Sequence, residues 1–182
     1  MRPIFQRLQM FFLAGAALLF GTAAPLRAIE VKPPFGLNWG ETQDKLTALL
    51  DGAQAKVVEK RELNDKEIWT VEGLLQPRLR RTLFYFREKE LTDVELQYED
   101  ASWDVPKYDE FLSDIRRRIE QIYGPGTLIA RQKGPDQGVS ETIVGYQWNM
   151  ENGSLQLFYY AAEKPPDVFR TVSVHYKSSA TR

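Results

Sequence analysis

The sequence predicts an α+β fold made of two tandem repeats, each a helix followed by a four-stranded antiparallel sheet (αββββ), that form one compact unit. LFYF at Leu83–Phe86 is followed by VELQY at Val94–Tyr98. Later, LFYY at Leu157–Tyr160 is followed by VSVHY at Val172–Tyr176. Each pair comes after a helical stretch that ends at a glycine, at a nearly equal distance. Matching order, spacing and motifs together indicate a duplication.

The first 28 residues have the layout of a secretory signal peptide, with a basic start, an uncharged run over Met10–Ala24, and small residues before a cut after Ala28 or Ala23. The run is shorter than the ~20 residues that span a bilayer comfortably. We therefore expect cleavage, a periplasmic or secreted protein, and no stable membrane anchor afterwards. An uncleaved anchor is the alternative.

The organisation that follows from this is a first repeat over residues 29–100, a second repeat over residues 101–177, and a flexible tail over residues 178–182. The chain has no cysteine, which excludes a lipidated cysteine, disulfides and thiolate chemistry. Its 24 basic and 25 acidic residues are interspersed, so nucleic acid is not an expected partner.

The first helix is predicted to start at Thr42, a good N-cap residue, and to end at Asp51-Gly52. Leu46, Leu49 and Leu50 give it one apolar stripe. Alternating segments with turn residues between them then predict four strands: KVVEKREL, EIWTVEGL, RTLFYFRE and LTDVELQYE.

The second helix is predicted to begin near Asp104 and Pro106 and to end at Gly124. Apolar residues from Tyr108 to Tyr123 recur at helical spacing. Four more strands are expected: TLIARQK, TIVGYQWNM, SLQLFYYAAE and FRTVSVHYK. Asn152-Gly153 favours a hairpin between two of them, and we expect a polar loop at Gly134–Ser140.

No residue pattern indicates catalysis. His175 is the only histidine, and there is no cysteine, so the usual metal ligands are missing and neither a metal nor a cofactor is expected. The motifs of nucleotide-binding and hydrolase sites are absent from suitable contexts. We therefore expect a protein that is not an enzyme. A Ser–His–Asp triad through His175 is the alternative.

Aromatic residues point instead to a binding surface. If helices cover one face of the sheet, alternation leaves the other face open unless something else covers it. With Leu83 and Leu157 on the helix side, the open face would carry the predicted binding residues Phe84, Phe86, Phe158, Tyr160, Gln97 and His175. The alternative is that these rings are core, because the two sheets cover each other or because the register is reversed.

The opening motif FGLNWGETQDKLTALL, Phe35–Leu50, resembles the helix entry of the β-lactamase-inhibitor-like and SmpA/OmlA-like superfamily of small exported α+β proteins. The resemblance implies a non-catalytic scaffold; the inhibitor branch joins two units into a long concave sheet that grips a partner enzyme through aromatic residues. The lipidated cysteine and the disulfides of its members are absent here. Neither the membrane-assembly role nor the β-lactamase target can therefore be carried over.

The sequence thus leads to a non-catalytic exported protein-binding module that uses an antiparallel sheet face. Its expected partner is an envelope or secreted protein. The alternative is a carrier of a small molecule or lipid in the cell envelope, with the ligand between the sheet and the helices.

Overall fold

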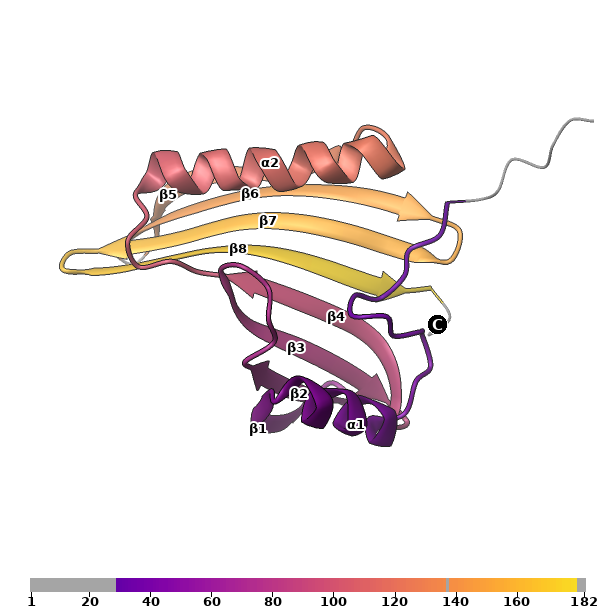
Figure 1. Cartoon of the computed structure of the whole chain (residues 1–182). Coiled ribbons are helices and arrows are strands. Elements are labelled where there is room, and N and C mark those ends of the chain that lie inside the picture. The colour runs from indigo at the N-terminus through magenta and orange to yellow at the C-terminus, as the bar shows by residue number, and fades with distance from the viewer. Residues whose placement is uncertain (1–28, 137, 180–182) are drawn as a thin grey trace, which may run out of the picture.

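The computed structural model describes residues 29–136 and 138–179 of the chain (Figure 1). The predicted signal peptide and the end of the predicted tail lie outside these residues. The elements in chain order are α1 (Gln43–Ala53), β1 (Lys56–Leu63), β2 (Lys66–Glu72), β3 (Leu79–Arg87), β4 (Glu90–Tyr98), α2 (Val105–Tyr123), β5 (Thr127–Asp136), β6 (Val139–Met150), β7 (Gly153–Lys164) and β8 (Asp167–Ser178).

All eight strands belong to one antiparallel sheet with the order β1-β2-β3-β4-β8-β7-β6-β5. The strands β4 and β8 join its two ends, with Leu96 opposite Val174 and Tyr98 opposite Val172. The prediction of two helix-plus-four-strand repeats is therefore wrong, because the strands make a single continuous sheet. Pairing of β4 with β8 satisfies the backbone N–H and C=O groups that two separate sheets would each leave unpaired at an edge.

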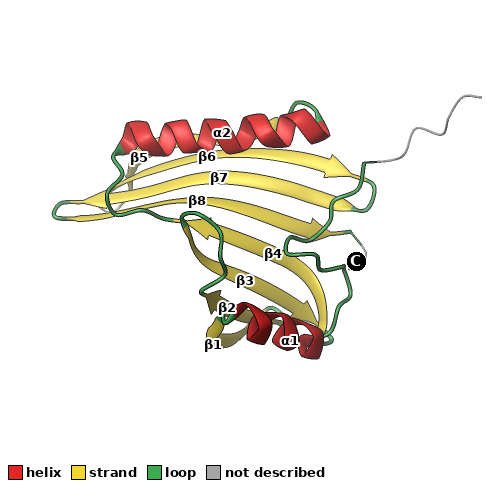
Figure 2. Ribbon diagram, viewed as in Figure 1, coloured by secondary structure: helices red, strands yellow, loops and turns green. Residues whose placement is uncertain are grey.

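Both helices lie on the same side of the sheet, α2 packed on β7 and β8 and α1 near β1–β3 (Figure 2). The predicted helix starts are confirmed: the Thr42 side chain accepts a hydrogen bond from the Lys45 amide, and Asp104 accepts one from the Lys107 amide at 3.1 Å. Between them, the helices and the sheet bury one continuous apolar cluster that reaches from Leu46 of α1 to Ile119 of α2.

The segment before α1 closes the space between the helices (Figure 1). Val31 is fully buried, and its amide and carbonyl both hydrogen-bond to the side chain of Asn152, each at 2.9 Å. The Trp39 indole also donates to the Val31 carbonyl at 2.9 Å, and Phe35 packs 6.4 Å from Phe84 between ring centres. This side of the sheet is therefore covered by protein along its length.

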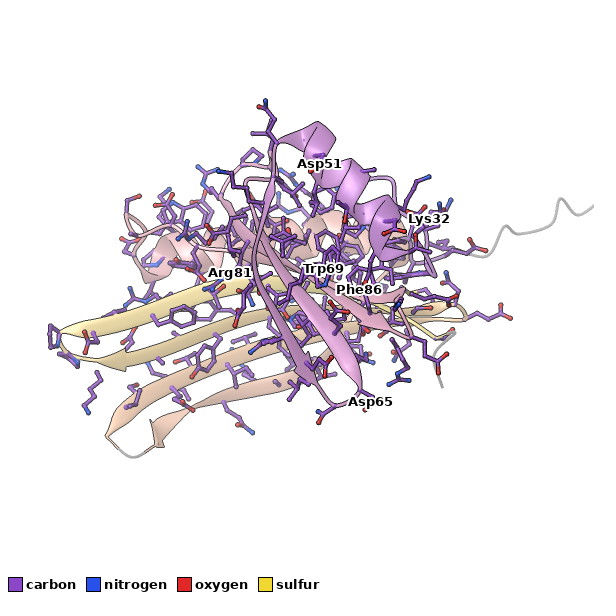
Figure 3. The ribbon with its side chains drawn as sticks, turned by 90° about the horizontal axis from the view of Figure 1, so that it is seen from below. Lys32, Asp51, Asp65, Trp69, Arg81 and Phe86 are labelled. Carbon is purple, nitrogen blue, oxygen red and sulfur yellow. The ribbon has the colours of Figure 1, made fainter. Side chains whose placement is uncertain are left out.

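The opposite side of the sheet carries no helix, and the sheet bends around it. Figure 3 shows the tip of the β1–β2 hairpin, at Asp65, on the other side of the sheet from Asp51 of α1. In Figure 1 the outer strand at the far end, β5, likewise turns behind β6 and away from the helices. The helix-free side is therefore concave.

Within the described residues, neither helix combines the length and the apolar character needed to cross a membrane.

Candidate functional site

The helix-free side of the sheet gathers ten side chains from five neighbouring strands, and we call this surface the concave face. Cross-strand pairing fixes its membership: Tyr85 lies opposite Asp93, Glu95 opposite His175, and His175 opposite Gln156. The surface is defined here by Ile68, Leu83, Tyr85, Glu95, Gln97, Gln156, Phe158, Tyr160, Ser173 and His175.

Four of the six predicted binding residues lie on the concave face. Phe158 and Tyr160 come from β7, Gln97 from β4 and His175 from β8, and all four are half-buried. The structure thus brings together, across adjacent strands, the aromatic and polar groups that the sequence placed on an open face.

The other two, Phe84 and Phe86, do not belong to this surface. They are 0% and 1% exposed and lie in the core on the helix side, where Phe86 packs 5.2 Å from Trp69 between ring centres (Figure 3). The expectation that they lie on the open face is wrong. The prediction aligned LFYF with LFYY and therefore placed Leu83 on the helix side. In the structure the faces of LFYF are offset by one residue from those of LFYY, and such an offset moves every side chain to the other face.

The same shift explains why Tyr85 was missed. Tyr85 lies on the concave face, and its hydroxyl donates a hydrogen bond to Oε2 of Glu95 at 2.8 Å. Burial, and then the negative charge of Glu95, raise the pKa of Tyr85 well above its ordinary value, so the phenol stays protonated and keeps donating. Glu95 lies two residues before Gln97 on β4 and therefore shares its face.

Glu95 is the centre of a hydrogen-bond network on the concave face. It is only 8% exposed, and Gln97 donates to its Oε1 at 2.6 Å while Tyr85 occupies Oε2. A buried carboxylate without partners would be costly, so these two donors are what make its position tolerable. The network holds Tyr85, Glu95 and Gln97 in fixed positions across β3 and β4.

His175 joins this network through a single ring nitrogen. Its Nε2 lies 3.0 Å from Oγ of Ser173 and 3.5 Å from Oε1 of Glu95. Burial lowers the pKa of His175, against the opposing attraction of Glu95, so the imidazole is neutral at pH 7. In a catalytic triad the serine and the acid contact opposite nitrogens of the histidine. The arrangement here does not have that geometry.

The ring of Phe158 packs directly against a glycine. A Cβ added to Gly145, its neighbour on β6, would lie 2.5 Å from Cε1 of Phe158, so only glycine leaves room for the ring. The ring also meets His175 edge-on, with 5.4 Å between ring centres. Phe158 is therefore an oriented aromatic surface rather than a mobile side chain.

A hollow of about 290 Å³ continues the concave face toward the β1–β2 hairpin. Strands β2, β3, β4 and β8 and the hairpin line it with Leu63, Asn64, Lys66, Ile68, Tyr85, Arg87, Asp93, Val94, Glu95, His175, Tyr176 and Lys177. The sequence did not predict this hollow, because it depends on how far the hairpin bends over the sheet.

The part of the chain that the structure describes contains no group of three or more histidine, aspartate or glutamate side chains placed to hold a metal ion. Comparisons with protein-family models, with curated proteins and with solved structures found no match.

Proposed function

We propose that the chain is a non-catalytic, exported protein-binding module whose concave face contacts another protein of the cell envelope or the extracellular space. The observation that carries this proposal is the combination of Phe158 and Tyr160, half-buried and not covered by a helix, with a network of polar groups beside them. Surfaces that mix rigid aromatic rings with polar groups are typical of protein interfaces.

The fixed positions of these groups favour tight recognition. Phe158 is oriented by Gly145 and His175, and Tyr160 donates a hydrogen bond to Glu141 at 2.9 Å. Side chains that are already ordered lose less conformational entropy when a partner binds. The concave face is open and does not enclose a ligand. It therefore suits the surface of a folded protein or an extended segment better than it suits a small molecule, which usually binds in an enclosed pocket.

The space between the sheet and the helices, where a carrier would hold its ligand, is occupied by side chains. Tyr108 of α2 packs 5.9 Å from Tyr159 of β7, and Phe111 packs 5.3 Å from Tyr98 of β4, measured between ring centres. This packing favours protein binding on the concave face over the alternative of a carrier with an interior ligand.

Site-specific photo-cross-linking in the producing cell tests the proposal. A benzoylphenylalanine at Tyr160 or at Gln156 reports on the concave face, and one at Leu75 or Ile122, which are 95% and 60% exposed, is the matched control. We expect the two concave positions to give cross-links to the same polypeptide, and the two control positions to give none to it.

Cross-links to that polypeptide from Leu75 or Ile122 alone would place the interface elsewhere and overturn the proposal. Absence of any cross-link from the concave positions, with both variants folded and present at normal levels, would do the same. Recovery of the chain from the periplasm or the medium, with a mass that starts after Ala28 or Ala23, tests export separately.

A further inference from the structure

The hollow beside the concave face has an uneven distribution of charge. Asp93 lies directly opposite Lys177 in the pairing of β4 with β8, but it forms its ion pair with Lys66, at 2.6 Å. Asp93 also accepts a hydrogen bond from Thr92 at 2.7 Å. One carboxylate therefore faces two ammonium groups at this end of the hollow.

The second carboxylate of the hollow offsets only part of the positive charge, because three cations (Lys66, Arg87 and Lys177) line the hollow with two carboxylates. Glu95 already accepts hydrogen bonds from Tyr85 and Gln97. Within residues 29–136 and 138–179, no acidic side chain lies within 4.0 Å of the Lys177 ammonium group. Lys177 is half-buried and lines the hollow, so its charge acts on a group that enters that space.

Two further cations extend the positive region. Arg87 lines the hollow and lies 3.8 Å from Asp65 of the hairpin. Arg61 of β1 lies opposite Ile68 on the same side of the sheet and is exposed, and its charge acts on the Tyr85 phenol. The floor between these cations is apolar, formed by Ile68 and the ring of Tyr85.

A partner that matches this hollow must bring a negative charge next to apolar atoms. We propose that an aspartate or glutamate side chain of the bound protein enters the hollow and pairs with Lys177, with its own methylene groups or a neighbouring apolar residue on Ile68 and Tyr85. This inference rests on the proposed function, since it names the chemistry of the segment that the concave face binds.

Complementary charge of this kind selects partners and speeds their encounter more than it adds affinity. A partly exposed pair is also screened by salt. Acidic segments should therefore be preferred over neutral ones of similar shape, and the preference should weaken at high ionic strength.

Selection from a random 12-residue peptide library displayed on phage, with the chain purified without its first 28 residues as bait, tests the inference. We expect the selected peptides to be enriched in Asp and Glu beside an aromatic or aliphatic residue. Lys177→Gln should weaken a selected peptide roughly two- to fivefold, equivalent to about 0.4–1 kcal/mol. Lys177→Glu should abolish the acidic enrichment when it is used as the bait.

Lys133→Glu is the matched control, because Lys133 is an exposed residue of the edge strand β5 and the substitution changes the net charge by the same amount. It should leave both the enrichment and the affinity unchanged. Equal effects of Lys133→Glu and Lys177→Glu, or selected peptides without acidic enrichment, would overturn the inference.

The outcome also separates this inference from the proposed function. If Phe158→Ser abolishes peptide binding and the substitutions of Lys177 do not change it, the concave face is still the binding surface. Only the inference that a carboxylate of the partner pairs with Lys177 would then be wrong. Peptides that tolerate both Phe158→Ser and Tyr160→Ser would contradict the concave face itself, and the acidic anchor with it.

Discussion

Phe84 and Phe158 are aromatic residues of inner strands that lie on opposite faces of the sheet. Phe84 is fully buried beneath the helix side, whereas Phe158 is half-buried on the concave face. Truncating a ring in a packed core removes its contacts and leaves a cavity, which costs ~3–5 kcal/mol. Truncating a half-exposed ring removes less apolar burial and leaves no closed cavity.

We therefore expect Phe84→Ala to lower the free energy of unfolding by ~3–5 kcal/mol and Phe158→Ala by about 1–2 kcal/mol. Urea unfolding followed by tryptophan fluorescence measures both. Similar losses for the two variants would mean that Phe158 is as enclosed as Phe84, and the concave face would then not be a free surface.

His175 gives a second prediction, because it is the only histidine in the chain. Groups from three strands surround it: Glu95 and Asp93 on β4, Ser173 and Lys177 on β8, and Phe158 on β7. Burial is the largest influence and lowers its pKa below the ordinary value of 6.5, against the attraction of the two carboxylates. The folded chain therefore takes up this proton at lower pH than the unfolded chain does.

The sign of the pH dependence follows from that difference. The stability that neutral His175 contributes is complete above pH 6.5, and it is lost as the pH falls from there through the folded-state pKa. Between about pH 7.5 and 5, wild type should lose more free energy of unfolding than His175→Gln, in which the carboxylates still titrate. An NMR titration of the histidine with a midpoint above 6.5 would contradict this.

At this scale, the sequence predicts a side chain's face well where alternation alone decides it. Gln97, Phe158, Tyr160 and His175 follow the alternation of their own strands. Phe84 and Phe86 were misplaced because their face was inferred by analogy with a second motif. Phe84 lies opposite Val94, whereas Val174 of the second motif lies opposite Leu157, so the two motifs pair in different registers.

At the scale of elements, α2 offers the clearest test, because its start depends on one side chain. The Asp104 carboxylate accepts the hydrogen bond of the Lys107 amide, which would otherwise lack a partner in the first turn. Loss of such a cap typically costs ~1 kcal/mol. Asp104→Ala should therefore lower the free energy of unfolding by about that amount.

Ser113→Ala is the control for this prediction, because Ser113 is exposed in the middle of the same helix. It should change the stability little, since alanine is a good helix former. Chemical unfolding of the three proteins side by side gives the comparison. An effect of Asp104→Ala no larger than that of Ser113→Ala would show that the start of α2 does not depend on its cap.

Helix starts and strand positions were predictable because capping and alternation are local signals. The segment Gly134–Ser140 was not, since its composition predicts a loop whereas β5 extends to Asp136 and β6 begins at Val139. Gly134 pairs with Glu141 and Pro135 pairs with Ser140, so the two strands continue through a segment whose composition is typical of a turn. Proline is tolerated there because β5 is an edge strand.

For the whole molecule, the continuity of the sheet predicts one unfolding transition. The buried cluster includes Phe84 and Leu96 from the first four strands as well as Leu157 and Val174 from the last four, so neither group has a core of its own. Far-UV circular dichroism and tryptophan fluorescence should report the same midpoint in urea. Two separated midpoints would show that the two groups of strands unfold independently.

The joining of the two groups of strands could not be predicted from the sequence. Pairing of β4 with β8 connects residues far apart in the chain, such as Val94 and Tyr176, and no local pattern specifies it. The apolar alternation in both strands is equally compatible with two sheets stacked face to face. The concave face, and the hollow that extends it, depend on this long-range pairing.

The strand order has a consequence for how the chain acquires its structure. The last of the described strands, β8, lies between β4 and β7 in the middle of the sheet. Until it arrives, the earlier strands can form only separate partial sheets, and contacts between segments distant in the chain form slowly. Completion of the sheet therefore depends on the segment Asp167–Ser178, because β1–β4 and β5–β7 stay unjoined until it pairs with both.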